Sequence, residues 1–256
     1  MVAGCCSSKN RAGRQPQPRL STWPISVNPA WAEPADAYPA AHRNSRAQLE
    51  AAVIAALFVD GRGAYARLNG VELWDEKRDA RTYPGPHPVV AHPPCSRWCR
   101  LAGLVEARWG HKRGEDGGCF AAALDAVRKW GGVLEHPAYT DAWAAFGLCR
   151  PPRQGGWLGD LWGGWVCHVE QGRYGHPAKK ATWLYAVGCQ LPILRWGSVT
   201  DSYAGAIGGL WKGALVSWCG NHTQRRDNRP RIGKRAASAT PVEFRDVLVG
   251  MARSAA

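Results

Sequence analysis

One segment in the middle of the chain constrains the fold most, because two short apolar stretches flank a clear helix. The stretch PHPVVAH (Pro86–His92) is β-branched near its end, and GVLEHP (Gly132–Pro137) stops at a proline. Between them Phe120, Leu124 and Val127 recur at helical spacing, and a glycine pair ends the helix. A strand, a helix and a strand in this order predict a βαβ unit, whose two strands are parallel and share one sheet.

Other parts of the chain predict further elements of the same kind. Three more stretches suit strands: GVELWD (Gly70–Asp75), WVCHVEQGRYGH (Trp165–His176) and KKATWLYAVG (Lys179–Gly188). The last stretch, TPVEFRDVLVGMARS, suits a helix with Phe244, Val247, Leu248 and Met251 on one side. SRAQLEAAVIAALFVD (Ser45–Asp60) starts with a capping-box spacing and suits a helix, whereas its end, Ala56–Asp60, suits a strand. We predict an α/β, Rossmann-like fold with a mostly parallel sheet flanked by helices.

The two ends of the sequence differ in composition. Residues 1–44 are rich in Pro, Ala, Arg and Ser without periodicity, which predicts a disordered, mildly basic tail. Residues 45–256 are predicted to form a single domain, with a small basic, irregular region at about 197–238. No apolar run reaches the roughly 18 residues that a membrane span needs, and the N-terminus lacks the apolar centre of a signal peptide. We therefore expect a cytoplasmic protein without a membrane partner.

The charge balance favours a polyanionic partner. The net charge is +13 and the isoelectric point is about 9.6, which indicates nucleic acid most simply, although a basic surface without a partner is the alternative. The loop NHTQRRDNRPRIGKR concentrates this charge and would contact phosphates, unless it is only a solvated loop. Its candidate nucleic-acid-binding residues are Arg225, Arg226, Arg229, Arg231, Lys234 and Arg235.

A cysteine and a carboxylate are predicted to meet at one edge of the sheet. In an open parallel sheet, ligands bind beyond the carboxyl ends of the strands. Cys95 follows the strand that ends near Ala91, and Glu135 lies at the end of the strand from Gly132. Cys95 is then a candidate nucleophile, presented by a rigid Pro-Pro turn and activated by a partner. The alternatives are an inert cysteine in a proline-shaped loop and a strand-end acid paired with an arginine.

Metal binding is not expected. Nine cysteines in a chain of 256 residues indicate mostly reduced thiols. His92, Cys95 and Cys99 have H-x2-C-x3-C spacing, and Cys167-His168 could add ligands, but no second C-x2-C-like pair follows. A zinc-dependent nucleobase deaminase would carry its histidine and cysteine motifs in the opposite order.

The motifs AHPPCSRW, VLEHP and EQGRYGH, in this order, resemble the catalytic core of cytosine-5 DNA methyltransferases. The run RYGHPAKKATWLYAVG and the last helix are similar to small phage and prophage members of that group. The resemblance covers about Val71–Trp196 and the last helix. It implies a DNA-modifying enzyme in which Cys95 attacks carbon 6 of a cytosine flipped out of the duplex. It also implies that Glu135 holds the ring nitrogen and exocyclic amine, and that Gln171 and Arg173 position the base and the acid. S-adenosylmethionine would supply the methyl group; Arg173 as a solvated or phosphate-facing side chain is the alternative.

Two departures from the family pattern affect the expected site. His136 stands where the resemblance implies Asn after the catalytic Glu. The resemblance also implies a glycine-rich turn, a helix and an acid for the cofactor, and the matching cofactor-binding candidates are Asp60, Gly61, Gly63, Asp75 and Pro94. Only seven residues, 64–70, follow the turn before the next strand, too few for a helix of about ten residues.

The shortened cofactor region leaves three possible functions: a methyltransferase with a rebuilt pocket, an enzyme that does not use S-adenosylmethionine, and a DNA-binding fold without activity. The pocket is either rebuilt, for instance with the upstream helix at residues 45–57, or absent. If it is absent, the chain is a Cys-dependent pyrimidine-modifying enzyme that does not use S-adenosylmethionine, or a catalytically degenerate methyltransferase fold that binds DNA.

Overall fold

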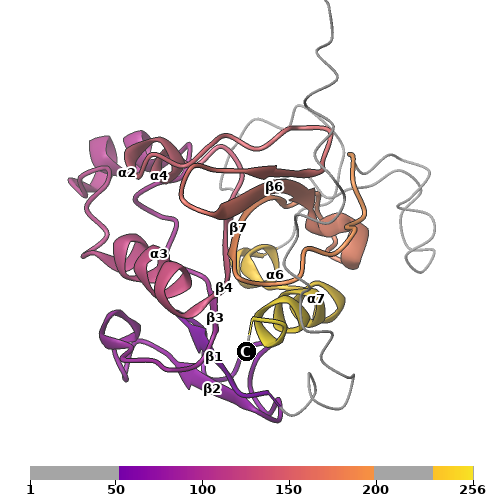
Figure 1. Ribbon diagram of the computed structural model, residues 1–256. Helices are drawn as coiled ribbons and strands as arrows, with labels where there is room; N and C mark the ends of the chain where they lie inside the picture. Colours follow the sequence, from indigo (N-terminus) through magenta and orange to yellow (C-terminus); the bar gives the residue numbers. More distant parts are fainter. Residues whose placement is uncertain (1–51, 199–232, 256) are drawn as a thin grey trace, which may run out of the picture. The chain divides into compact units, whose positions relative to one another are not determined.

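A computed structural model describes residues 52–198 and 233–255, which form a seven-stranded sheet with helices on both faces (Figure 1). The strand order is β2-β1-β3-β4-β7-β6-β5. The strands are β1 (Ile54–Leu57), β2 (Val71–Trp74), β3 (Val89–Ala91), β4 (Gly132–Pro137), β5 (Trp157–Gly159), β6 (Gly164–Glu170) and β7 (Ala181–Val187).

The sheet is parallel at one end and antiparallel at the other. Strand β1 pairs in parallel with both β2 and β3, and β3 pairs in parallel with β4, with Val89 opposite Gly132. The predicted βαβ unit is therefore confirmed. The pairs β4–β7, β7–β6 and β6–β5 are antiparallel. The sheet is thus mixed, and the prediction of a mostly parallel sheet holds only for β2, β1, β3 and β4.

The helices agree with the sequence pattern where the apolar periodicity is strong. They are α2 (Ala102–Trp109), α3 (Cys119–Trp130), α4 (Asp141–Ala145), α6 (Lys234–Ser238) and α7 (Val242–Arg253), with 3-10 helices η2 (Ala80–Thr82) and η3 (Gln171–Tyr174). Helices α3 and α7 confirm the predictions, whereas α2, α4 and strand β5 were not predicted. The prediction that about 197–238 is irregular is wrong at its end, because Lys234–Ser238 form α6. The strand expected over Trp165–His176 is wrong beyond Glu170, because the chain turns there into η3.

Helix α3 covers one face of the sheet and α7 the other (Figure 1). Successive strand residues point to opposite faces, so each strand contributes to both cores. The α3 core contains Ala55, Leu57, Val89, Ala91 and Leu134 from the strands, packed with Phe120, Leu124 and Val127. The α7 core contains Ile54, Ala56, Val90 and Val133, packed with Phe244, Leu248 and Met251. Burying each large apolar side chain contributes about 1.5–3 kcal/mol.

The connection from β1 to β2 contains no helix, and the C-terminal helix α7 packs beside it. Residues 58–70 contain turns and no α-helix, as the sequence predicted. Arg245 Nη1 donates to the Ala64 carbonyl at 2.8 Å, and Arg253 Nη2 donates to the Asn69 carbonyl at 2.6 Å. The C-terminal helix therefore holds this connection in place. An upstream helix over residues 45–57 is wrong in its last turn, because Ile54–Leu57 is a strand.

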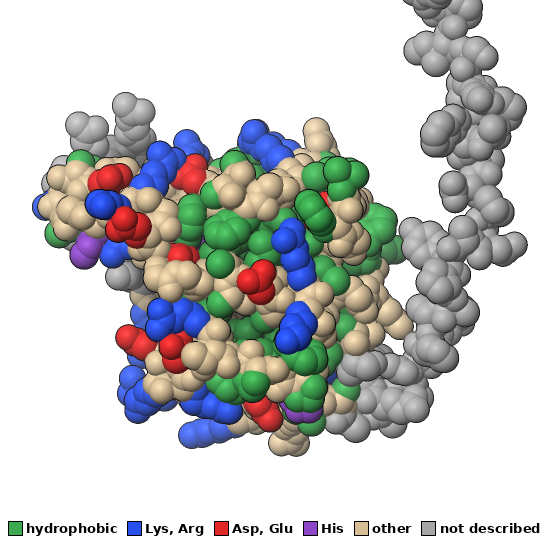
Figure 2. Space-filling model, turned by 60° about the vertical axis from the view of Figure 1, so that its left-hand side comes forward, with side chains coloured by type: hydrophobic (Ala, Val, Ile, Leu, Met, Phe, Trp, Pro, Cys, Tyr) green, Lys and Arg blue, Asp and Glu red, His purple; other side chains and the backbone are tan. Residues whose placement is uncertain are grey.

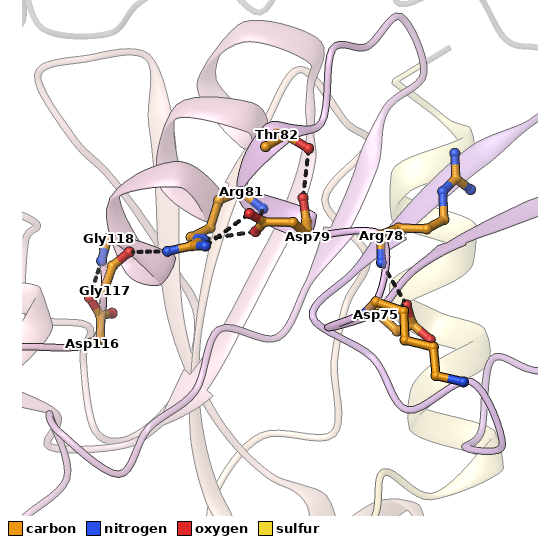
Figure 3. A network of polar contacts seen from close by, with 9 residues as sticks. Asp75, Arg78, Asp79, Arg81, Thr82, Asp116, Gly117 and Gly118 are labelled. Atoms are coloured by element: carbon orange, nitrogen blue, oxygen red, sulfur yellow. Dashed lines mark hydrogen bonds and ion pairs between the residues drawn. The ribbon is translucent and has the colours of Figure 1, made fainter.

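A polar network fixes the beginning of α3 (Figure 3). Arg81 pairs with Asp79 and donates from Nη1 to the Gly117 carbonyl at 3.0 Å. Asp116 accepts the backbone N–H groups of Gly118 at 3.0 Å and Phe120 at 2.8 Å, so it satisfies donors at the helix start. None of the helices in the described parts of the chain is both long and apolar enough to cross a membrane.

Candidate active site

The carboxyl ends of β1, β3, β4 and β6 meet at one edge of the sheet. Strand β6 points the same way as β4 because both are antiparallel to β7. Between β1 and β3 the strand order reverses, since β2 lies on the far side of β1. Ligands of open α/β sheets bind at such a reversal, beyond the carboxyl ends of the strands. The candidate residues after β3 and at the end of β4 lie at this edge.

Glu135 is buried at this edge and forms hydrogen bonds with two other side chains. Its carboxylate is 9% exposed; Oε2 lies 2.9 Å from His92 Nδ1, and Oε1 accepts a hydrogen bond of 2.9 Å from Gln171 Nε2. Burial alone would raise the pKa of the Glu135 carboxyl. The hydrogen bond from His92 and the charge of Lys180 outweigh burial and hold that pKa at about 2. Glu135 is therefore a carboxylate at neutral pH.

His92 links Glu135 to the turn that follows β1. Because a carboxylate only accepts, the His92 Nδ1–H donates to it, and His92 Nε2 forms a hydrogen bond of 2.7 Å with the Tyr65 hydroxyl. Burial, followed by the charge of Glu135, raises the pKa of Tyr65 well above its usual value, so the hydroxyl keeps its proton. Three side chains from three segments thus form one hydrogen-bonded chain.

Gln171 is fixed in orientation by its second partner. The Thr182 hydroxyl donates to the Lys180 carbonyl at 3.0 Å, so it accepts from Gln171 Nε2, also at 3.0 Å. The amide nitrogen of Gln171 therefore points to Glu135, as the sequence-based pairing of these two residues requires. Gln171 Oε1 is buried and has no hydrogen-bond partner among the described residues.

Cys95 lies in the turn after β3 but is not activated by its surroundings. Its carbonyl accepts from the N–H groups of Trp98 at 3.0 Å and Cys99 at 2.8 Å, which makes the turn compact. Burial, the neighbouring Cys99 and the charge of Glu135 raise the pKa of the thiol to about 11, against a smaller effect of Lys180. The thiol is protonated at neutral pH. These surroundings therefore do not favour the thiolate, and the expected activation of Cys95 by a partner stays a prediction.

Lys180 is a site residue that sequence reasoning missed. It precedes β7 with φ of 41°, a left-handed conformation that costs a non-glycine residue about 1–3 kcal/mol and occurs often at functional sites. Its Nζ donates to the carbonyls of Ser238 at 3.0 Å and Ala239 at 2.8 Å. Burial lowers the pKa of Lys180, whereas the charge of Glu135 raises it. Lys180 supplies positive charge near both Cys95 and Glu135.

Arg173 binds the backbone of the segment that follows β7. Its Nε and Nη2 donate to the carbonyls of Gly197 at 2.9 Å and Ser198 at 2.8 Å. The Ser198 hydroxyl in turn donates to Glu170 at 3.0 Å. These contacts hold the end of the described segment against η3. The predicted contact of Arg173 with a bound base stays a prediction.

His136 points to the opposite face from Glu135 and lies among aromatic rings. The ring centroids of Phe120 and Trp143 lie 5.2 and 6.3 Å from that of His136. The side chain is fully buried, and neither ring nitrogen has a hydrogen-bond partner among the described residues. Burial outweighs the charge of Glu135 and lowers the pKa of His136 to about 4. His136 is a neutral core residue below the Pro93-Pro94-Cys95 turn.

The glycine turn and the acid predicted for a cofactor do lie together. A Cβ at Gly61 would lie 3.4 Å from Asp75 Oδ2, and a Cβ at Gly63 would lie 3.0 Å from the Asp60 carbonyl. Asp75 Oδ1 accepts the N–H groups of the two residues Lys77 and Arg78 at 3.0 and 3.1 Å (Figure 3). Asp75 Oδ2 therefore faces the glycine turn. The fifth cofactor candidate, Pro94, is exposed in the Cys95 turn.

The remaining candidates are placed only in part. Arg225, Arg226, Arg229, Arg231 and the side chain of Lys234 lie outside the described residues, as do the predicted tail and most of the basic region. Arg235 is exposed on α6. Within residues 52–198 and 233–255, no group of three or more His, Cys, Asp or Glu side chains could hold a metal ion. Both nitrogens of His92, which the zinc alternative would have used, are bound to Tyr65 and Glu135.

Three residues of the candidate site, His92, Lys180 and Tyr65, were not predicted to act there. The first two carried a weak indication in the sequence, and Tyr65 carried none. His92 stands three residues before Cys95 in the same motif, but it was weighed only as a metal ligand. Lys180 lies in a predicted strand, and Tyr65 lies in a turn without any motif. No protein-family model, no curated protein and no solved structure matches this chain, so its own geometry is the basis for assigning a function.

Proposed function

We propose that this chain is a DNA-modifying enzyme in which Cys95 adds to the ring of a pyrimidine base, with methyl transfer to carbon 5. The observation that carries the proposal is that Cys95 follows β3 while Glu135 lies near the end of the neighbouring β4, where Gln171 donates to it and it is held as a carboxylate. The strand order β2-β1-β3-β4 supports a doubly wound, Rossmann-like sheet, because it matches the first four strands of the doubly wound order 2-1-3-4-5.

The high pKa of Cys95 fits an addition in which the thiol proton stays with the reactants. The sulfur forms a bond to carbon 6 of cytosine, and the π electrons of the C5–C6 bond move toward N3. Glu135 takes the thiol proton and passes it to N3, so no net proton enters from water. The exocyclic amine donates to the Glu135 carboxylate. The proton that reaches N3 neutralises the negative charge that develops there as the sulfur adds.

Completion of the reaction regenerates the thiol. The electron pair at N3 returns through the ring, and carbon 5 forms a bond to the transferred methyl group. The proton on carbon 5 then leaves to water, the C5–C6 double bond forms again as the bond from carbon 6 to sulfur breaks, and the proton on N3 returns through Glu135 to the sulfur of Cys95. S-adenosylmethionine, when bound, would supply the methyl group on a positively charged sulfur that leaves neutral.

The residues at the glycine turn fit such a donor in part. Because Gly61 has no Cβ, which would lie 3.4 Å from Asp75 Oδ2, the turn lies close to this oxygen, which could accept from a ribose hydroxyl. The turn is not followed by a helix, and α7 covers β1 instead. This specific difference favours a second candidate function, Cys-dependent pyrimidine modification without S-adenosylmethionine.

Covalent trapping tests the proposal. Duplex DNA containing 5-fluorocytosine is incubated with the full chain and S-adenosylmethionine, because fluorine at carbon 5 blocks the last step. We expect an adduct on the Cys95 peptide by mass spectrometry, and none with Cys95→Ser. An adduct that forms equally well without S-adenosylmethionine supports the second candidate. The absence of any adduct, with DNA binding intact, overturns both and leaves a degenerate DNA-binding fold.

A further inference from the structure

Helix α2 lies close after the Cys95 turn and has little of the protein to pack against. Of its eight residues, Ala102–Trp109, only Ala102 is buried. Leu104 is 49% exposed and Trp109 is 56% exposed. A helix of this length is marginal in water unless an apolar face is covered. The exposed side of α2 is therefore a candidate binding surface.

The segment that carries α2 is anchored firmly to the Cys95 turn. Its two ends are joined by a hydrogen bond of 2.9 Å from the Gly114 N–H to the Arg97 carbonyl. The buried Trp98 donates from Nε1 to Asp116 at 2.8 Å, and its carbonyl accepts from the Asp141 N–H at 2.9 Å. The Trp98 N–H also donates to the Cys95 carbonyl. The start of this segment is therefore held firmly against the Cys95 turn.

Positive charge accompanies the exposed rings of α2. Lys112 and Arg113, which follow the helix, already pair with Glu115 and Asp141. Arg100 and Arg108 are exposed and have no carboxylate partner among the described residues. The Arg108 guanidinium carbon lies 5.1 Å from the Trp109 ring centroid. Figure 2, which brings the α2 and α4 side forward, shows Lys and Arg side chains among hydrophobic and acidic ones.

We propose that α2 binds the DNA strand that carries the target base, with Trp109 stacking on a base and Arg100 and Arg108 contacting phosphates. This inference rests on the proposed function for its choice of DNA. An aromatic ring beside unpaired arginines is the arrangement that single strands require, because every base has a face to stack and every phosphate has a charge. An apolar protein partner would leave both arginines unmatched. The helix follows the Cys95 turn in the chain and is joined to it through the Trp98 N–H.

The opposite edge of the sheet offers a matched control. The loop between β5 and β6 exposes Leu161 by 97% and Trp162 by 71%, and the Arg128 guanidinium carbon lies 5.8 Å from the Trp162 ring centroid. Strand β6 starts at this loop and ends at Glu170, next to Gln171 of the site. Trp162 and Arg128 therefore repeat the chemistry of Trp109 and Arg108 on the edge away from Cys95.

Binding of a labelled single-stranded DNA by fluorescence anisotropy tests the inference. We expect Trp109→Ala to weaken binding about 10-fold, because one stacked base is lost. Trp162→Ala should bind like the unmodified chain. The double change Arg100→Ala with Arg108→Ala should reduce the slope of log affinity against log salt by about 1.4, and Arg128→Ala should not change it. Both tryptophans are largely exposed, and equal thermal unfolding of the variants checks that the fold is kept.

The outcomes separate this inference from the proposed function. Equal affinities of Trp109→Ala and Trp162→Ala, or no binding by the unmodified chain, overturn the α2 surface. If the 5-fluorocytosine adduct forms while these two variants bind alike, the proposed function stands and the inference fails. If Trp109→Ala alone weakens binding and no adduct forms, α2 is a DNA surface on a protein without the proposed chemistry.

Discussion

Glu135 and His136 are neighbours in β4, yet the regions around them are opposite in character. Glu135 faces the α7 side, where His92 and Gln171 donate to it and Lys180 adds positive charge. His136 faces the α3 side, among aromatic rings that offer no hydrogen bond. Both side chains are buried, but the first is charged and the second is neutral.

The difference shows that burial alone does not set the state of an ionisable group. Burial opposes the charge on both residues, and only Glu135 has donors that outweigh it. The α7 side therefore holds the charged Glu135 and the side chains that donate to it. The α3 side forms an apolar support below the Cys95 turn.

The largest expected effect follows from removing the charge on the α7 side. Glu135→Gln leaves one oxygen for two donors, so we expect adduct formation with 5-fluorocytosine DNA to fall at least about 100-fold. The free energy of unfolding should fall by about 1–3 kcal/mol, because one buried donor is left unpaired. His136→Phe, on the other face, is the control and should keep adduct formation. Equal losses in both variants would contradict the division between the two faces.

The state of the Cys95 thiol gives the next effect. With a pKa of about 11 instead of 9.0, Cys95 has about 100-fold less thiolate at neutral pH than an ordinary cysteine. We expect correspondingly slow alkylation by iodoacetamide, increasing with pH up to about 11, as measured on the Cys95 peptide by mass spectrometry. Lys180→Ala should slow it further. Alkylation at the rate of N-acetylcysteine would show that the thiol is activated after all.

The neutral state of His136 predicts how stability depends on pH. Its pKa is about 4 in the folded chain and 6.5 in its ordinary state, so the unfolded chain takes up the proton first as the pH falls. The free energy of unfolding should therefore decrease by about 3 kcal/mol between pH 6.5 and pH 4. Chemical denaturation at several pH values measures this. His136→Phe should lose this part of the pH dependence, and an unchanged slope would argue against a buried neutral ring.

The smallest effect tests the end of the hydrogen-bonded chain. Tyr65→Phe removes the hydrogen bond of 2.7 Å to His92 and should lower the free energy of unfolding by about 1 kcal/mol. Glu135 keeps both of its own donors, so adduct formation should decrease far less than in Glu135→Gln. A loss as large as that of Glu135→Gln would mean that Tyr65 takes part in the chemistry.

Much of the framework was predictable because it depends on local patterns. The helix around Phe120 and the strands on either side of it have clear apolar periodicity, and parallel pairing follows from their order. That order also placed Cys95 and Glu135 at the same edge. The antiparallel insertion of β7 between β4 and β6 was not predictable, because strand pairing depends on long-range contacts that no local pattern records. Helix α2 was missed because it has only eight residues and no capping side chain marks its start.

The sequence by itself determined which residues alternate between the two cores, where the βαβ unit lies and which two candidate side chains lie near the ends of its strands. Only the tertiary structure decided their chemical state. Tyr65, His92, Gln171 and Lys180 come from four separate segments, and their hydrogen bonds and charges act on Glu135 and Cys95 only after the sheet has formed. The charge of a buried group depends on the balance between desolvation and nearby partners, and that balance exists only in three dimensions.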